Sequence, residues 1–391
     1  MLLFLSVFAV YYATSPRAVW SGDSIFYAMT ARQLVNKGSV DLSDQIELTD
    51  PSADLSGSWL TKGPGGLVSI YPPGTALLAA PFFVLDRESP GVLTMVNVGN
   101  TNSEITIHVP PLTPATIASA AITAAAVAAI FFMLGKLGAT RKEAVIGALV
   151  FGFATGAWSV SSQRLWAHGP AMMWLTLGMY FRETSRKGLA GWTDLAAVIT
   201  RPPTAVIGGI RTVMKAVRTR RVGPAIHDIA WLVVGVAIVA LYNVAILGSG
   251  SLLGGYSTVS RITDPDVGWW ATNLAGALFG PQRGLLTISP FILFLLFGVR
   301  QGWGSAVPWV REAAIGGVAY FLVHNLSHDF RGGDGYFGYR YPLEAVAVSV
   351  PLLFCCYRSW FKGHTLRLAG LLIAIAVSVL LQAFGVANQF G

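Results

Sequence analysis

The segment 115–134, ATIASAAITAAAVAAIFFML, contains 20 residues and no charged side chain. A helix of about 20 mostly apolar residues matches the hydrocarbon thickness of a bilayer. The whole chain shares this character, because 53% of its 391 residues are hydrophobic and 12% are charged. Soluble domains carry about a quarter charged residues. The sequence therefore predicts an integral membrane protein and excludes an ordinary soluble domain.

Apolar runs of this kind recur along the chain, some of them shortened where Gly or Pro interrupts a helix. They predict about eleven transmembrane helices in an all-α polytopic protein, and residues 1–391 form one transmembrane domain. The predicted spans are 2–14, 115–134, 145–161, 169–181, 189–199, 204–214, 229–247, 285–299, 313–322, 342–357 and 368–389.

The positions of Lys and Arg predict the orientation of these spans. More than half of the 27 basic residues fall in short connectors, which the positive-inside rule assigns to the cytoplasm. These connectors are 136–142, 182–187, 211–221, 300–311 and 358–367. The net charge of +8 then reflects topology and not a nucleic-acid partner. We expect a multi-pass protein of the cell (cytoplasmic) membrane.

With this orientation, three longer polar segments lie on the extracytoplasmic side, at 15–112, 248–284 and 325–341. The first is too long for a simple connector, so we expect it to be partly helical and to carry function. After Gly22, the residues Phe26, Tyr27, Thr30 and Leu34 recur at helical spacing, which places Asp23 at or near a helix N-terminus. A carboxylate there caps the helix or takes part in a reaction at the membrane surface.

Two proline pairs mark further elements near this face. In Tyr71-Pro72-Pro73-Gly74, the prolines precede a short apolar helix that is predicted to lie in the membrane interface. Arg201 precedes Pro202 and Pro203 and lies between two short apolar runs. A broken helix pair at membrane depth normally lines a cavity, so we expect Arg201 to face one.

Five motifs follow one another in a characteristic order. They are the Gly22-Asp23 helix with Tyr27, the Tyr71-Pro72-Pro73-Gly74 turn, Thr200-Arg201-Pro202-Pro203, Gly280-Pro281-Gln282-Arg283-Gly284-Leu285 before Ser289-Pro290, and Gly338-Tyr339-Arg340-Tyr341-Pro342. Together they resemble the GT-C superfamily of polytopic membrane glycosyltransferases, which includes protein O-mannosyltransferases and aminoarabinose transferases. The resemblance covers nearly the whole chain.

The resemblance implies an inverting glycosyltransferase that moves a sugar from a polyprenyl-phosphate carrier to an acceptor hydroxyl on the extracytoplasmic face. Asp23 matches the acidic residue of the first outer loop, which acts in such enzymes as catalytic base or acceptor-orienting carboxylate. The acceptor is a lipid, a glycan or a protein, and membrane lipids surround the enzyme. No cofactor and no nucleic acid is implied.

The leaving group of such a transfer is a phosphate anion, so cations are needed beside it. We expect the donor phosphate or substrate to be bound by Tyr27, Lys62, Tyr71, Arg201, Arg283, Arg331 and Arg340. Arginine can bind phosphate oxygens through two hydrogen bonds. Related sequences often have a lysine before the Tyr-Pro-Pro-Gly turn where this chain has Ile70, which passes the phosphate contact to Lys62 or to an arginine.

Other functional classes remain as alternatives. A transporter or flippase of a lipid-linked sugar needs an ion-coupled acidic residue within the membrane, and Asp194 is the candidate. A non-catalytic protein of envelope assembly would tolerate changes at Asp23. His168, His324 and His328 lack the tight spacing of a metal site, and we expect no metal.

Overall fold

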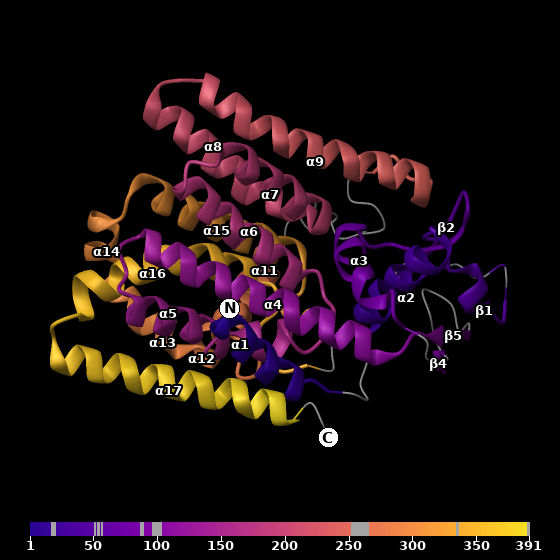
Figure 1. Ribbon diagram of the computed structural model, residues 1–391, viewed down its shortest axis with the longest axis horizontal. Helices are drawn as coiled ribbons and strands as arrows, with labels where there is room; N and C mark the ends of the chain where they lie inside the picture. The colour runs from indigo at the N-terminus through magenta and orange to yellow at the C-terminus, as the bar shows by residue number, and fades with distance from the viewer. Residues whose placement is uncertain are drawn as a thin grey trace.

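The computed structural model describes residues 1–16, 21–50, 52, 55, 58–86, 90–95, 104–251, 266–333 and 336–388. Long helices run roughly side by side through most of the molecule, with α9 and α17 on opposite margins of the view in Figure 1. The longer helices are α1 (Leu2–Ala13), α4 (Leu112–Lys136), α5 (Arg141–Phe153), α6 (His168–Glu183), α7 (Lys187–Thr200), α8 (Ala205–Thr219), α9 (Gly223–Leu247), α11 (Val267–Phe279), α15 (Pro308–Ser327), α16 (Leu343–Cys356) and α17 (Thr365–Ala387).

The predominantly helical fold is confirmed, whereas the number of eleven spans is not. Every predicted span overlaps helical segments, but among the residues that the structure describes four helices are long and apolar enough to cross a membrane. These are Leu112–Lys136, Ala225–Leu247, Leu343–Phe361 and Thr365–Ala387, which are compatible with a membrane protein. Other predicted spans are interrupted and form helices too short to cross a membrane. In the run 285–299, Ser289-Pro290 separates α12 (Leu285–Ile288) from α13 (Pro290–Leu296), and α14 (Val299–Ser305) follows.

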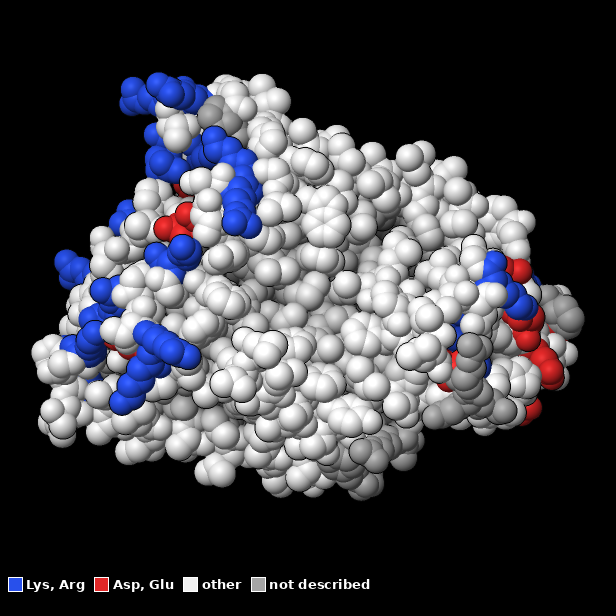
Figure 2. Space-filling model, viewed as in Figure 1, with Lys and Arg blue, Asp and Glu red and all other residues white. Residues whose placement is uncertain are grey.

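Charged side chains gather at the two ends of the face shown in Figure 2, and a broad band between them carries neither Lys, Arg, Asp nor Glu. One end is almost entirely basic, and we call it the basic end. It contains predicted connectors that contact one another. Arg358 donates to the Leu137 carbonyl at 3.0 Å, the Ser305 and Ser359 hydroxyls lie 2.8 Å apart, and Trp309 donates to Glu183 at 2.6 Å. The connectors therefore share one end of the bundle, as the positive-inside pattern predicts.

The first long polar segment folds at the opposite end, where α2 (Gly22–Lys37) and α3 (Gly74–Ala79) lie beside short strands (Figure 1). It contains two small antiparallel sheets that the sequence analysis did not predict. The strands are β1 (Ile46–Leu48), β4 (Gly91–Met95) and β5 (Ile105–Val109) in the order β1-β5-β4, and β2 (Leu60–Gly63) paired with β3 (Gly66–Ser69). We call this the Asp23 end.

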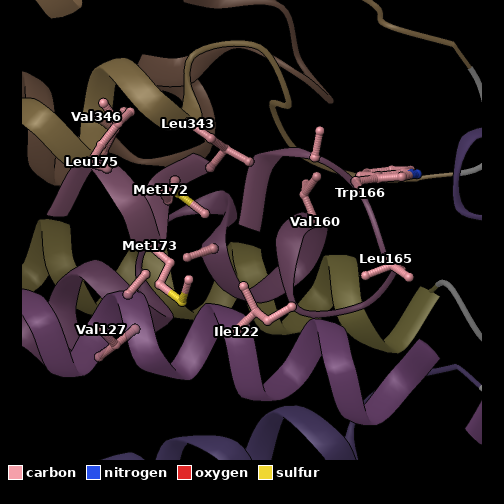
Figure 3. Close-up of a cluster of buried hydrophobic side chains, with 14 of the residues drawn as sticks. Ile122, Val127, Val160, Leu165, Trp166, Met172, Met173, Leu175, Leu343 and Val346 are labelled. Carbon is pink, nitrogen blue, oxygen red and sulfur yellow. The ribbon is translucent and has the colours of Figure 1, made fainter. Parts of the chain in front are cut away.

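The centre of the bundle is packed with apolar side chains from α4, α6 and α16 (Figure 3). Ile122, Met172 and Leu343 are fully or almost fully buried there. The many alanines of α4 let α6 approach closely, because small side chains allow helix backbones to pack together. This rigid centre supports the residues at the Asp23 end.

Candidate functional site

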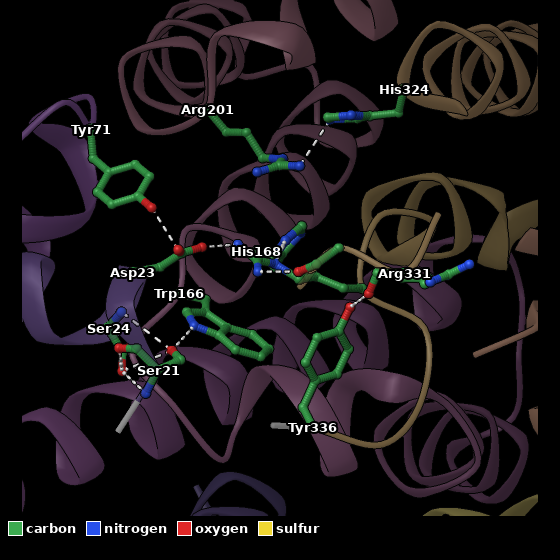
Figure 4. Close-up of polar contacts among 12 residues, drawn as sticks. Ser21, Asp23, Ser24, Tyr71, Trp166, His168, Arg201, His324, Arg331 and Tyr336 are labelled. Carbon is green, nitrogen blue, oxygen red and sulfur yellow. Dashed lines mark hydrogen bonds and ion pairs between the residues drawn. The ribbon is translucent and has the colours of Figure 1, made fainter. Parts of the chain in front are cut away.

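Asp23 lies in the first turn of α2, and the start of this helix is fixed by its neighbours. Ser21 is the N-cap, and Ser21 and Ser24 form a reciprocal capping box. The cap is therefore Ser21 and not Asp23, which leaves the carboxylate available for side-chain contacts. The Tyr71 hydroxyl donates a hydrogen bond of 2.5 Å to one carboxylate oxygen, and Arg340 donates to the other (Figure 4).

The Tyr-Pro-Pro-Gly turn places Tyr71 against α2. The ring of Tyr71 stacks on Tyr27, with 4.8 Å between centroids, and both side chains are buried. Gly74 is required by its contact with the end of α7, because a Cβ there would lie 2.5 Å from Thr200 Oγ1 and 2.6 Å from Thr200 Cα. The turn therefore packs directly beside Arg201.

Arg340 is held by three further contacts. Its Nε donates to His168 Nε2 at 3.0 Å, and its Nη1 donates to the Gly332 carbonyl at 2.9 Å. The guanidinium also lies over the Trp166 ring, 4.5 Å from the centroid, as expected of a cation–π contact. These contacts fix the orientation of Arg340 toward Asp23.

The hydrogen bonds of Arg340 determine the tautomer of His168. An arginine Nε can only donate, so His168 Nε2 accepts and its proton resides on Nδ1. Nδ1 lies 2.8 Å from Glu344 Oε1 and donates to it. Both His168 and Glu344 have 0% exposed side chains. The imidazole is therefore neutral and links Arg340 to a buried carboxylate.

Glu344 in turn bonds Arg201. Its Oε1 lies 3.0 Å from Arg201 Nε, which also donates to the Tyr320 hydroxyl at 2.7 Å. Arg201 Nη2 donates to His324 Nε2 at 2.8 Å. Arg201 has an extended backbone (φ −149°, ψ 91°), because the residue before a proline is disfavoured in the helical region. The helix break predicted at Pro202 thus turns the Arg201 side chain inward.

One continuous set of contacts results, which we call the buried polar chain. It runs from Tyr71 through Asp23, Arg340, His168, Glu344 and Arg201 to His324. It contains two carboxylates and two guanidinium groups, and such buried charges are stable only when they are paired and hydrogen-bonded.

Asp23 remains ionised over the physiological range. Burial by itself raises the pKa of this carboxyl group, but the charge of Arg340 and the hydrogen bonds from Tyr71 and Arg340 outweigh burial. The pKa of Asp23 is therefore below its ordinary value. A carboxylate in this state binds protons weakly for as long as Arg340 stays beside it.

The remaining predicted residues lie outside the buried polar chain. Arg283 stacks over Tyr336 at 4.3 Å and bonds the carbonyls of Arg331 and Gly333, so it shapes the loop that carries Arg340. The Arg331 side chain is 71% exposed and points away from Asp23 (Figure 4). Lys62 is exposed on β2, where its charge acts on Asp50.

Two residues in the middle of the buried polar chain, His168 and Glu344, were not predicted as site residues. Glu344 lies within the predicted span 342–357, and a charged residue inside an apolar run is itself a signal of function. His168 was weighed only as a metal ligand, although it directly precedes the predicted span 169–181. The partners of both lie far away along the chain, which the sequence pattern does not show.

Asp194 has a separate, structural environment. It is 4% exposed and bonds both Arg211, at 2.7 Å, and Arg182. The three residues come from α7, α8 and α6, and together they join these helices near the basic end.

Replacing Gly74 by Ala should destabilise the protein and displace Tyr71. The added methyl group overlaps the backbone of Thr200, and overpacking of this kind costs about 1–3 kcal/mol. Thermal unfolding in detergent should show a lower midpoint for Gly74→Ala. The control is Gly188→Ala in α7, where a Cβ meets nothing within 4 Å. Equal midpoints for the two variants would contradict the proposed close contact.

A scan against protein-family models and a search of curated proteins each found no match to this chain.

Proposed function

We propose that the chain is an inverting membrane glycosyltransferase that moves a sugar from a polyprenyl-phosphate carrier to an acceptor hydroxyl. The observation that supports this proposal most is the contact of Asp23 with Arg340, beside Tyr71. It places a carboxylate and a guanidinium group together at one end of an apolar bundle. The acceptor is a lipid, a glycan or a protein, and the site faces the extracytoplasmic side of the cell membrane.

The reaction is a single displacement. The acceptor oxygen bonds to the anomeric carbon while the bond from that carbon to the phosphate oxygen breaks. The electron pair leaves with the polyprenyl phosphate, and the acceptor proton passes to Asp23. The leaving phosphate needs no proton from an acid, because positive charge from arginine stabilises it.

Arg340 has two roles in this proposal. In the free protein it pairs with Asp23, which keeps the carboxylate ionised and weakly basic. A donor phosphate competes with Asp23 for this guanidinium group. When Arg340 turns to the phosphate, Asp23 loses its counter-charge and becomes a stronger base at the moment the acceptor is bound. Arg201 is connected to Arg340 through Glu344 and His168, and Glu344 pairs with its charge.

The environment of Asp194 favours the transferase over the transporter alternative. An ion-coupled carboxylate must release its partner and bind a proton or cation in each cycle. Asp194 is instead held by two guanidinium groups away from the buried polar chain. A scaffold protein would have no need for a buried chain of seven polar side chains next to the first polar segment.

The proposal is tested by reconstituting the purified chain in vesicles with polyprenyl-phosphate sugars and a panel of hydroxyl acceptors. We expect transfer of the sugar with inversion of its anomeric configuration. Movement of the intact lipid-linked sugar across the bilayer without transfer would instead establish the transporter alternative.

Replacing Arg340 by Gln should move the pH dependence of transfer. Without Arg340, the charge that lowers the pKa of Asp23 most is lost while burial remains, so the pKa of Asp23 rises. A base is active above its pKa, so the loss of activity on acidification should begin at a higher pH than in the wild type. The pH profile of the residual transfer rate measures this shift. Arg331→Gln, an exposed arginine of the same loop, is the control and should leave the profile unchanged.

A further inference from the structure

A cavity of about 350 Å³ lies between α5, α13, α16 and α17, away from the buried polar chain. It extends along α5 from Lys142 to Phe151, a distance of about 14 Å at 1.5 Å per residue. Its floor is formed by Phe151, Phe291 and Val346, each at most 5% exposed. Almost the whole lining is hydrocarbon, so an apolar ligand fits this cavity.

The cavity opens sideways between α5 and α17. Ile146 on α5 and Leu372 on α17 line it and are 46% and 54% exposed. The surface around this opening is apolar, because α17 is a candidate membrane span with a third of its most apolar window buried. In a membrane, the opening would face lipid chains and not water.

The charged residues that line the cavity both lie in the first turn of α5. Lys142 lines the cavity beside Glu143. Glu143 is bonded by Lys362 at 2.8 Å and by the Thr140 hydroxyl at 2.9 Å, so its negative charge is already compensated. Arg358 bonds the carbonyl of Leu137 close by. The end of the cavity at Lys142, which we call its mouth, is therefore positively charged.

We propose that this cavity binds one acyl chain of an anionic phospholipid whose phosphate lies beside Lys142. The apolar walls match the chain, and the basic mouth matches the headgroup of a lipid in the adjoining leaflet. The tail of a sugar donor fits less well, because its phosphate would lie at the Asp23 end and no charge at Lys142 would be needed. The proposal depends on the membrane location proposed above but not on the transfer reaction.

Native mass spectrometry of the detergent-purified chain tests this site, with dioleoylphosphatidylglycerol and dioleoylphosphatidylcholine as probes. We expect one phosphatidylglycerol molecule to bind more tightly than phosphatidylcholine. Lys142→Ala should weaken phosphatidylglycerol by about fivefold, which corresponds to one basic residue near an anionic surface, and should leave phosphatidylcholine unchanged. Val150→Trp fills the cavity and should abolish the tight site.

Two control variants introduce the same kinds of substitution at positions outside the cavity. Val233→Trp adds the same ring to an exposed apolar position of α9, and Lys187→Ala removes a charge from another connector at the basic end. Both should bind phosphatidylglycerol like the wild type. Equal binding of the two lipids, or no effect of Lys142→Ala and Val150→Trp, would overturn the proposal. So would displacement of the bound lipid by undecaprenyl phosphate, which would assign the cavity to the donor tail.

Discussion

Replacing Asp23 by Asn should reduce sugar transfer by about 100 to 10,000-fold, the contribution of a positioned general base. Asparagine keeps the size of the side chain and can still accept the hydrogen bond from Tyr71, but it cannot take the acceptor proton. The rate of transfer from a polyprenyl-phosphate sugar in vesicles measures this loss. The matched control is Asp44→Asn, an acidic residue of the same segment that pairs with Lys37 and is 44% exposed.

Asp23→Asn should not weaken donor binding, in contrast to its effect on the transfer rate. Asp23 occupies Arg340 in the free protein, so its removal frees the guanidinium group for phosphate. Undecaprenyl phosphate should therefore stabilise Asp23→Asn against thermal unfolding at least as much as it stabilises the wild type. Full transfer activity in Asp23→Asn would disprove the base mechanism, and absent binding of undecaprenyl phosphate to the wild type would disprove the donor class.

Two members of the buried polar chain, Asp23 and Arg201, could be predicted because each lies in a motif with a local physical meaning. Asp23 follows a capping serine at the start of a helix, and Arg201 precedes a proline pair that must break one. A helix start and a helix break each depend on a few neighbouring residues, and both are present in the folded protein. The inward direction of Arg201 follows from the same break.

The middle of the chain could not be predicted in this way. Glu344 contacts His168 although 176 positions separate them in the sequence. The residues next to either one do not indicate this contact. The same limit applies to exposure. Lys62 and Arg340 are both basic residues of polar segments, yet Lys62 is exposed on a hairpin and the Arg340 side chain is only 14% exposed. Packing of distant elements decides between these outcomes.

The fold also contains elements that the sequence predicted and elements that it did not. Long apolar runs predicted helices correctly, whereas the strands of the first segment are short and were missed. In β5, Ile105, Ile107 and Val109 are buried and alternate with Thr106 and His108, which is the two-residue period of a half-buried strand. This signal is present in the sequence, but it spans five residues and is easily outweighed by its polar surroundings.

Replacing Glu344 by Gln should destabilise the protein by about 3–5 kcal/mol, the typical cost of removing one partner of a buried ion pair. Arg201 would keep its charge with its side chain only 10% exposed, and the lost carboxylate is its partner at 3.0 Å. Denaturant unfolding of the detergent-solubilised chain, followed by tryptophan fluorescence, measures the change. Glu312→Gln is the control: Glu312 is also buried, but its partner Arg218 is 46% exposed and can be hydrated, so the cost should be smaller.

A second substitution separates charge from packing in this result. If the penalty of Glu344→Gln comes from the uncompensated Arg201, then Arg201→Gln in the same chain should recover part of the lost stability, because both charges are gone. Additive losses in the double variant would show that the two residues act independently. Such additivity would contradict the claim that the buried polar chain connects Arg201 to Arg340. It would also mean that this chain does not hold the two arginines, which are distant in sequence, at one site.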